Sequence, residues 1–152
     1  MTFLLNVLLF LQPQIQALPE IPRVVVGLVD GQQLVVENPE FSGFIETRGG
    51  DSVLAYRQAN FHGNLSVKSI QRVDFGEYKK GKPFQLTVTL KNGQKLEIET
   101  EGSDYLMVQG KTDSGTVTIK HPDPLNPVVK IRTKKADRQK DLKITYLEFP
   151  AL

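Results

Sequence analysis

Cysteine and tryptophan are both missing from this chain of 152 residues. Without cysteine there can be no disulfide, no thiol nucleophile and no zinc site built from thiolates. The same absence excludes a lipid anchor on an acylated cysteine, and it suits an exported protein without requiring export. Charge is nearly balanced as well, with 19 basic against 17 acidic residues, so the overall field predicts no particular class of partner.

Histidine is scarce, and both examples, His62 and His121, adjoin a turn or a connector. We therefore expect exposed loop histidines rather than acid–base groups. Two isolated histidines cannot supply a zinc site of the His-Glu-x-x-His type, and no Gly-x-Ser-x-Gly nucleophile motif occurs. The Gly-Lys-Thr letters within residues 110–116 lack the earlier glycine and the following helix of a phosphate-binding loop. The sequence thus predicts no catalytic residues, no metal, no cofactor and no enzyme.

The first 17 residues differ from the rest of the chain. Phe3–Leu11 is an apolar run broken by one asparagine, and Ala17 ends a segment that fits a cleavage site, although no lysine or arginine precedes the run. Nine residues are too few to cross a hydrocarbon core about 30 Å thick. We expect a signal peptide at 1–17 and a mature β domain at 18–152, periplasmic or secreted and not transmembrane. The alternative is a strand or helix buried in the fold.

Beyond residue 23, apolar residues alternate with polar ones, which is the period of half-buried strands in an antiparallel sheet. Asp30-Gly31 and Asn92-Gly93 each separate two alternating runs and predict hairpins with type I′ turns. No window keeps the helical spacing of apolar residues. We therefore expect an all-β protein of about a dozen short strands, in antiparallel meanders that form a β-sandwich or small barrels.

The alternation also predicts which side chains point into the core. Truncating a buried leucine, isoleucine or phenylalanine among them to alanine should cost about 2–5 kcal/mol. The predicted core residues are Leu34, Leu54, Leu65, Val67, Ile70, Val73, Phe75, Leu86, Val88, Leu96, Ile98, Leu106, Val117, Ile119 and Ile131.

A repeat runs through the alternating region. Residues 53–68 align without a gap on residues 105–120, a shift of 52 positions. Each copy follows a hairpin and precedes a closing strand, 70–75 in the first copy and 128–133 in the second. This shared order of hairpins and strands predicts an internal duplication. The predicted units are 24–75 and 84–133, followed by a C-terminal strand at 141–149.

The first unit combines an Asp-Gly hairpin with a Gly-x-Leu-x-Val strand and a closing strand that ends in phenylalanine. The residues that carry this pattern are Asp30, Gly31, Gly63, Leu65, Val67, Ile70, Val73 and Phe75. The pattern resembles that of uncharacterised secreted bacterial β-repeat proteins, whose units form Sm-like small barrels or meanders. The resemblance covers about two thirds of the chain and implies a fold type, without implying an active site.

An acidic row follows the second hairpin: Glu97, Glu99 and Glu101 alternate along one predicted strand, and Asp104 follows them. Alternate residues of a strand share one face at a spacing of about 7 Å. Such a row is most often the solvated side of an antiparallel strand, but it could also bind calcium or act as a glycosidase pair. A carbohydrate-active or metal-dependent enzyme is therefore the alternative to a non-enzymatic protein.

The region from Lys120 to Lys143 holds eight basic residues against three aspartates, and its densest part, 132–140, is predicted to be a loop. A local positive patch attracts phosphate, lipid headgroups or acidic polysaccharide. The other interpretation is a solvated loop that blunts a sheet edge. No aromatic residue lies among these charges, so nucleic acid is not expected. The candidate partner-binding residues are Lys134, Lys135, Arg138 and Lys140.

These patterns together predict a non-enzymatic protein of a bacterial envelope. It would bind another protein, or an anionic envelope polymer, through an edge strand or through the basic segment. Alternatively, it would contribute to an envelope assembly as a subunit. The sequence leaves the oligomeric state open.

Overall fold

A computed structural model describes residues 21–76, 82–103, 105–121, 129–133, 136–140 and 144–150, the fourth and fifth of these ranges as backbone only. Thirteen antiparallel strands within these ranges form one sheet, so the predicted all-β architecture is confirmed. No helix in these ranges is long and apolar enough to cross a membrane. The elements are β1 (Arg23–Leu28), β2 (Gln33–Gly43), β3 (Ile45–Arg48), β4 (Asp51–Gln58), β5 (Phe61–Ser66), the 3₁₀ turn η2 (Val67–Ser69), β6 (Ile70–Phe75), β7 (Gln85–Leu90), β8 (Lys95–Thr100), β9 (Leu106–Thr112), β10 (Gly115–His121), β11 (Val129–Thr133), β12 (Ala136–Lys140) and β13 (Ile144–Glu148).

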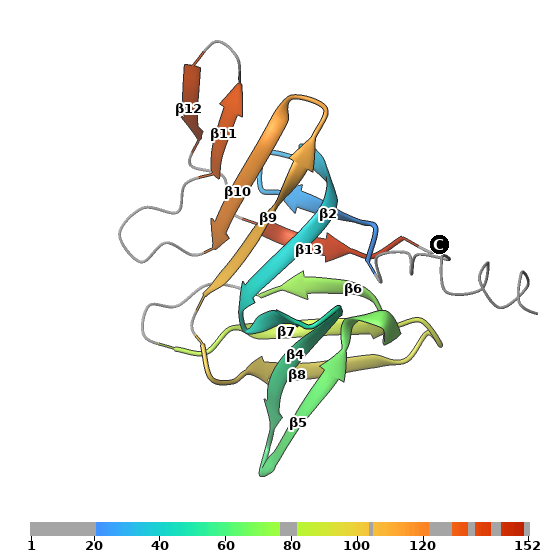
Figure 1. The fold of residues 1–152 in the computed structure, drawn as a ribbon. Coiled ribbons are helices and arrows are strands. Elements are labelled where there is room, and N and C mark those ends of the chain that lie inside the picture. Colours follow the sequence, from blue (N-terminus) through green and yellow to red (C-terminus); the bar gives the residue numbers. More distant parts are fainter. Residues whose placement is uncertain are drawn as a thin grey trace, which may run out of the picture.

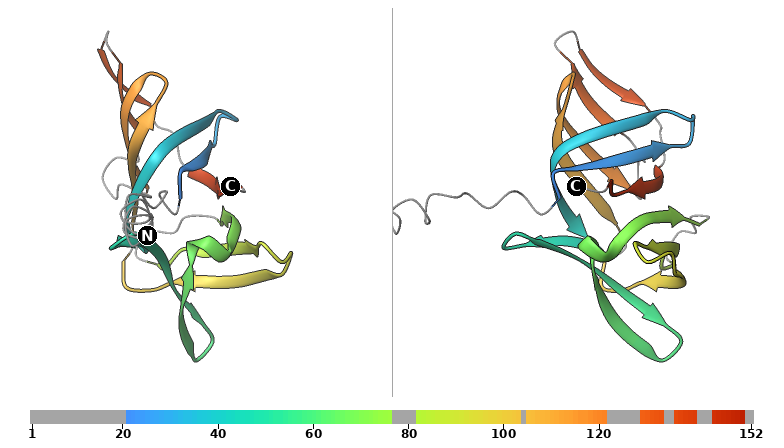
Figure 2. Two further views of the ribbon diagram at one scale, coloured as in Figure 1. Left: turned by 45° about the vertical axis from the view of Figure 1, so that its right-hand side comes forward. Right: turned by 90° about the vertical axis from the view of Figure 1, so that its right-hand side faces the viewer.

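The sheet curls into a half-barrel (Figure 1). Its strand order is β12-β11-β10-β9-β2-β1-β13-β6-β7-β8-β4-β3, with β5 paired to β4. Both views in Figure 2 place the β9–β10 hairpin and the β4–β5 hairpin at opposite ends of the molecule. Strands from the two ends of the chain therefore meet at the centre, where β13 lies between β1 and β6.

The pairing pattern repeats on the two sides of that centre. Arg23 pairs with Glu37 in the β1–β2 hairpin, and the residues 62 positions later, Gln85 and Glu99, pair in the β7–β8 hairpin. Each hairpin then pairs with a strand from the other half of the chain, β2 with β9 and β8 with β4. The β1–β2 hairpin, from the N-terminal half of the chain, thus lies beside β9 and β10, and the β7–β8 hairpin, from the C-terminal half, lies beside β4 and β5. Each half of the sheet therefore contains strands from both halves of the chain.

The hairpins β4–β5 and β9–β10 correspond in the same way. Tyr56 pairs with Gly63, and the residues 54 positions later, Gly110 and Val117, also pair. The sequence alignment, with its shift of 52, was wrong by two residues. A two-residue shift leaves every side chain on its predicted face, because the side-chain period of a strand is two.

The predicted counterpart of β6 is also wrong. Residues 129–133 form β11, which pairs with β10, whereas the strand in the position equivalent to β6 is β13. Val73 of β6 lies opposite Leu147 of β13, 74 positions later. Residues 70–75 read IQRVDF and residues 144–149 read ITYLEF, so the sequence carried this signal. The predicted units 24–75 and 84–133 stay a prediction about the origin of the chain.

The two glycine hairpins differ from the predicted turn type. In the first, Gly31 has φ +85° and its N–H donates to the Leu28 carbonyl at 3.0 Å. In the second, Gly93 has φ +89° and donates in the same way to Leu90 at 2.9 Å. A type I′ turn needs positive φ at both central residues, yet only Asn38 and Ala59 among the described non-glycine residues have it. Both connections are three-residue loops with glycine in the left-handed position.

The core follows the predicted alternation closely. Fully buried as predicted are Leu54, Val67, Ile70, Val73, Leu86, Val88, Ile98, Leu106, Val117 and Ile119. The residues Leu34, Leu65, Phe75 and Leu96 are partly buried against this core, and the side chain of Ile131 lies outside the described residues. The sequence reading missed Phe44 and Phe84, which pack with their ring centroids 5.4 Å apart.

Candidate functional site

Glu97 and Glu99 of the acidic row lie on β8, Glu101 follows just after its end, and Ile98 is buried on the opposite face. Each glutamate has a polar partner on β7 or β5: Thr87 Oγ1 donates to Glu97 at 3.0 Å, Gln85 Nε2 donates to Glu99 at 2.8 Å, and His62 Nδ1 lies 2.5 Å from Glu101. Asp104 lies outside the described residues. No three acidic or histidine side chains gather into a metal site in the part of the chain described. The enzyme that this row would serve therefore stays an alternative hypothesis.

The two histidines have different environments. His62 is exposed, as expected, but the expectation for His121 is wrong, because its exposed fraction is 4%. Its ring centroid lies 5.1 Å from that of Phe75, and its Nδ1 accepts a hydrogen bond from the Ile144 N–H at 3.2 Å. His121 is the last residue of β10 and continues the inward alternation of that strand. It therefore ties the end of β10 to the start of β13.

The basic segment is a hairpin rather than a loop, because Ala136–Lys140 forms β12 beside β11. Polar strand residues without apolar alternation gave no strand signal there. The backbone of Arg138 lies opposite Ile131, and that of Lys140 lies opposite Val129. The side chains of these residues, and all of Lys134 and Lys135, lie outside the described residues. Their role in partner binding stays a prediction.

A pocket of about 200 Å³ lies beside the irregular register of β2. Its lining is Ile21, Asn38, Pro39, Glu40, Thr47, Gly50 and Ser52. Thr47 Oγ1 already accepts a hydrogen bond from the Phe41 N–H at 3.0 Å and lies 3.0 Å from Ser52 Oγ. Among the described residues, the lining thus holds one ionisable side chain, Glu40, and hydroxyls that are used within the fold. This arrangement offers no nucleophile–base pair.

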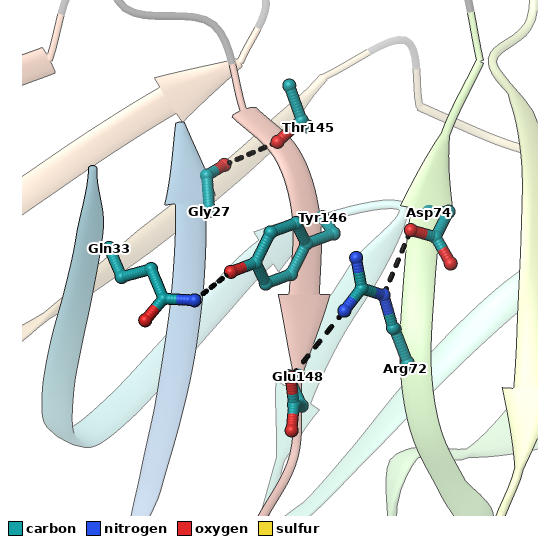
Figure 3. A network of polar contacts seen from close by, with 7 residues as sticks. All are labelled: Gly27, Gln33, Arg72, Asp74, Thr145, Tyr146 and Glu148. Carbon is teal, nitrogen blue, oxygen red and sulfur yellow. Dashed lines mark hydrogen bonds and ion pairs between the residues drawn. The ribbon is translucent and has the colours of Figure 1, made fainter. Parts of the chain in front are cut away.

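The outer face at the centre of the sheet carries a polar network (Figure 3). The Arg72 guanidinium lies over the Tyr146 ring at 3.9 Å, and its Nε donates to Asp74 at 2.9 Å. The hydroxyl of Tyr146 accepts a hydrogen bond from Gln33, and its ring covers Gly27 on β1. These contacts satisfy one another across β2, β13 and β6, so they explain how the two halves hold together rather than what they bind.

Substitutions of Gly27 and Tyr146 should therefore have strongly non-additive effects on the free energy of unfolding. A Cβ at Gly27 would lie 2.0 Å from Tyr146 Cε1, so Gly27→Ala must displace the ring and should cost about 1–3 kcal/mol. In a Tyr146→Ala background the same change should cost less than about 0.5 kcal/mol, because the obstacle is gone. Urea unfolding of the four proteins in this cycle measures the coupling. Equal costs of Gly27→Ala in both backgrounds would contradict the packing described.

Three described strands have a single paired neighbour: β3, β5 and β12. Natural sheets protect such edges with charged side chains. On β3, Arg48 donates to Glu46 at 2.9 Å, and this hydrogen bond and the charge of Glu46 raise the pKa of Arg48. The sequence of β12, ADRQK, holds three charges. In contrast, β5 reads FHGNLS and has no permanently charged residue, so its edge lacks this protection.

The backbone of β5 presents hydrogen-bonding groups at this edge. Gln58 and Phe61 flank the two-residue loop of the β4–β5 hairpin, which makes them a hydrogen-bonded pair. Every second residue of β5 from Phe61 onward therefore turns its N–H and C=O toward β4. The residues whose backbone groups turn to the free edge are His62, Asn64 and Ser66.

Apolar side chains line one face of the same hairpin. Phe61 is 60% exposed, and its ring centroid lies 6.1 Å from that of Tyr56. The Tyr56 ring also covers Gly63, where a Cβ would lie 2.6 Å from it. Leu65 continues this strip toward the core. The free edge of β5 is thus bordered by an aromatic surface, on a hairpin that projects from the molecule (Figure 2).

The β5 edge combines unpaired strand geometry, an exposed aromatic ring and little charge, and sequence reasoning had not singled it out.

Comparisons of this chain with models of protein families, with curated proteins and with solved structures found no match, so the resemblance to secreted bacterial β-repeat proteins stays a prediction.

Proposed function

We propose that this protein is a non-enzymatic binding domain that captures an extended segment of another macromolecule as an added strand beside β5. The observation that carries this proposal is the open edge of β5. Among the described strands, β5 pairs with β4 alone, and β5 carries no permanent charge. In strand addition, main-chain hydrogen bonds supply affinity and neighbouring side chains supply selectivity. The envelope location expected from residues 1–17 is part of the same proposal.

The side chains around the edge suit this role. Aromatic residues commonly anchor protein partners, because they bury much apolar area with few rotatable bonds. Phe61 is such a residue, and Tyr56 supports it from the neighbouring strand. The polar side of the hairpin carries Asn64 and the pair His62–Glu101, so a bound strand would meet an apolar and a polar face.

Site-specific photo-crosslinking in the producing cell tests this proposal. A photoreactive phenylalanine analogue at position 61 should give a defined adduct with a partner, because that side chain borders the edge. The matched control carries the analogue at Val29, which is 59% exposed on the β1–β2 connection and should give no such adduct. Adding Asn64→Pro should abolish the adduct, since proline cannot donate to a strand ladder.

Thermal melting must first show that the Asn64→Pro protein is folded. The same adducts from positions 61 and 29, or an adduct that survives Asn64→Pro, would contradict binding at the β5 edge. Reversing the charges of the basic segment, for example with Arg138→Glu and Lys140→Glu, tests the other surface that the sequence offers. If the charge-reversed variant loses the adduct and the Asn64→Pro variant keeps it, the binding site lies on the basic segment.

A further inference from the structure

The internal equivalence of the two halves shows what kind of strand fits the β5 edge. The strand β10 takes the place of β5 in the other half, since Gly110 and Val117 pair as Tyr56 and Gly63 do. The edge of β10 that corresponds to the free edge of β5 is occupied, because β11 pairs along it. Among the described strands, this edge is therefore filled in one half of the molecule and open in the other.

The filled edge has a definite register. Three residue pairs join β10 to β11: Val117 with Ile131, Thr118 with Lys130, and Ile119 with Val129. An antiparallel strand with apolar residues two positions apart and a polar residue between them occupies this edge. The β5 residues that lie 54 positions earlier than the three β10 residues are Gly63, Asn64 and Leu65.

We infer that the β5 edge takes an antiparallel peptide strand of the pattern apolar-polar-apolar, with its two apolar residues opposite Leu65 and Gly63 and its polar residue opposite Asn64. This inference rests on the proposed function and specifies its ligand. A residue opposite Gly63 would meet the Tyr56 ring directly, because the glycine leaves that ring uncovered by a side chain of its own. This position should therefore favour a large branched or aromatic side chain.

The alternating direction of the backbone N–H and C=O groups along β5 further specifies how the bound strand must pair. Asn64 turns its N–H and C=O to the free edge, so the polar residue opposite it should exchange both hydrogen bonds with Asn64. The two apolar residues of the bound strand would turn their backbone groups away from β5. Methylating the amide nitrogen of the polar residue should therefore block binding, and methylating that of an apolar neighbour should not.

The probe is a capped synthetic peptide, VVKIRT, which is the sequence of residues 128–133. In titrations monitored by backbone amide NMR, it should bind the full chain and shift the amides of β5. N-methylation at its lysine should weaken binding at least tenfold, and N-methylation at its isoleucine should change it less than threefold. The isomer VVIKRT, which breaks the alternation, should also lose at least tenfold in affinity.

Several results would overturn the inference. Equal binding of the two N-methylated peptides would exclude the register, and binding that persists in the folded Asn64→Pro protein would place the peptide elsewhere. If light scattering finds a dimer that Asn64→Pro separates, the occupant of the edge is a second copy of this chain. If no peptide binds while the crosslink from position 61 remains, the strand pattern is wrong and the proposed function stands. If neither peptide binding nor the crosslink from position 61 is observed, the proposed function is wrong as well.

Discussion

Phe44→Ala should lower the free energy of unfolding by about 3–5 kcal/mol, the range found for large aromatic truncations in cores. Phe44 is 1% exposed, and its ring centroid lies 5.9 Å from that of Phe75 and 5.4 Å from that of Phe84. These rings come from the connection after β2, from β6 and from the residue just before β7, so the cavity would open where the two halves of the sheet meet. Urea unfolding followed by circular dichroism measures the loss.

Phe61→Ala is the matched control for this prediction. It removes the same side chain from a surface position that is 60% exposed, so the change in unfolding free energy should stay within about 0.5 kcal/mol. The two substitutions thereby separate the ring that stabilises the fold from the ring that we assign to binding. A loss below about 1 kcal/mol for Phe44→Ala would contradict its place in the core.

Gly43→Ala should cost about 3 kcal/mol or more, from backbone strain together with overpacking. Gly43 ends β2 with φ +106°, and a Cβ there would lie 2.0 Å from the Tyr105 carbonyl oxygen. That oxygen accepts the hydrogen bond of the Phe44 N–H at 3.0 Å, so it cannot move away without breaking the link. The carbonyl of Phe44 in turn accepts from Ala55 of β4 at 3.1 Å, which ties this turn to the β4–β5 hairpin.

Gly31→Ala provides the comparison, because Gly31 also has positive φ, +85°, but has no atom within 4 Å of the added Cβ. Its cost should be the strain alone, about 1–2 kcal/mol. Thermal and urea unfolding of both variants should rank Gly43→Ala well below Gly31→Ala in stability. Equal losses would mean that the close approach of Tyr105 does not constrain the fold.

The sequence predicted local features well. Period-two alternation identified the strands and their buried faces, because one face of each strand must lie against the core. The same rule extended to His121 would have placed it inside, since it follows Val117 and Ile119 at a spacing of two. The prediction instead places His121 in the polar connector, whereas its ring packs beside that of Phe75.

Pairing between strands was predicted less well, since an alternating pattern states which face is buried and not which neighbour is paired. Order in the chain predicts that the strand at 128–133 is the counterpart of β6, whereas the fold places β13 there and adds β11 beside β10. The likeness of IQRVDF to ITYLEF was the signal that would have found the correct strand. The free edge of β5 follows from that difference between the halves, so no local pattern could reveal it.

The most direct test of strand addition at β5 is amide hydrogen exchange of individual β5 residues with and without the VVKIRT peptide. In the free protein, the Asn64 amide should exchange quickly, while those of Gly63 and Leu65, which turn toward β4, should be protected. The amide of Thr118, the equivalent residue on the edge covered by β11, should be protected as well. Adding peptide should slow exchange at Asn64 and leave its neighbours unchanged. An Asn64 amide that is already as protected as that of Thr118, or that the peptide does not slow, would contradict the account.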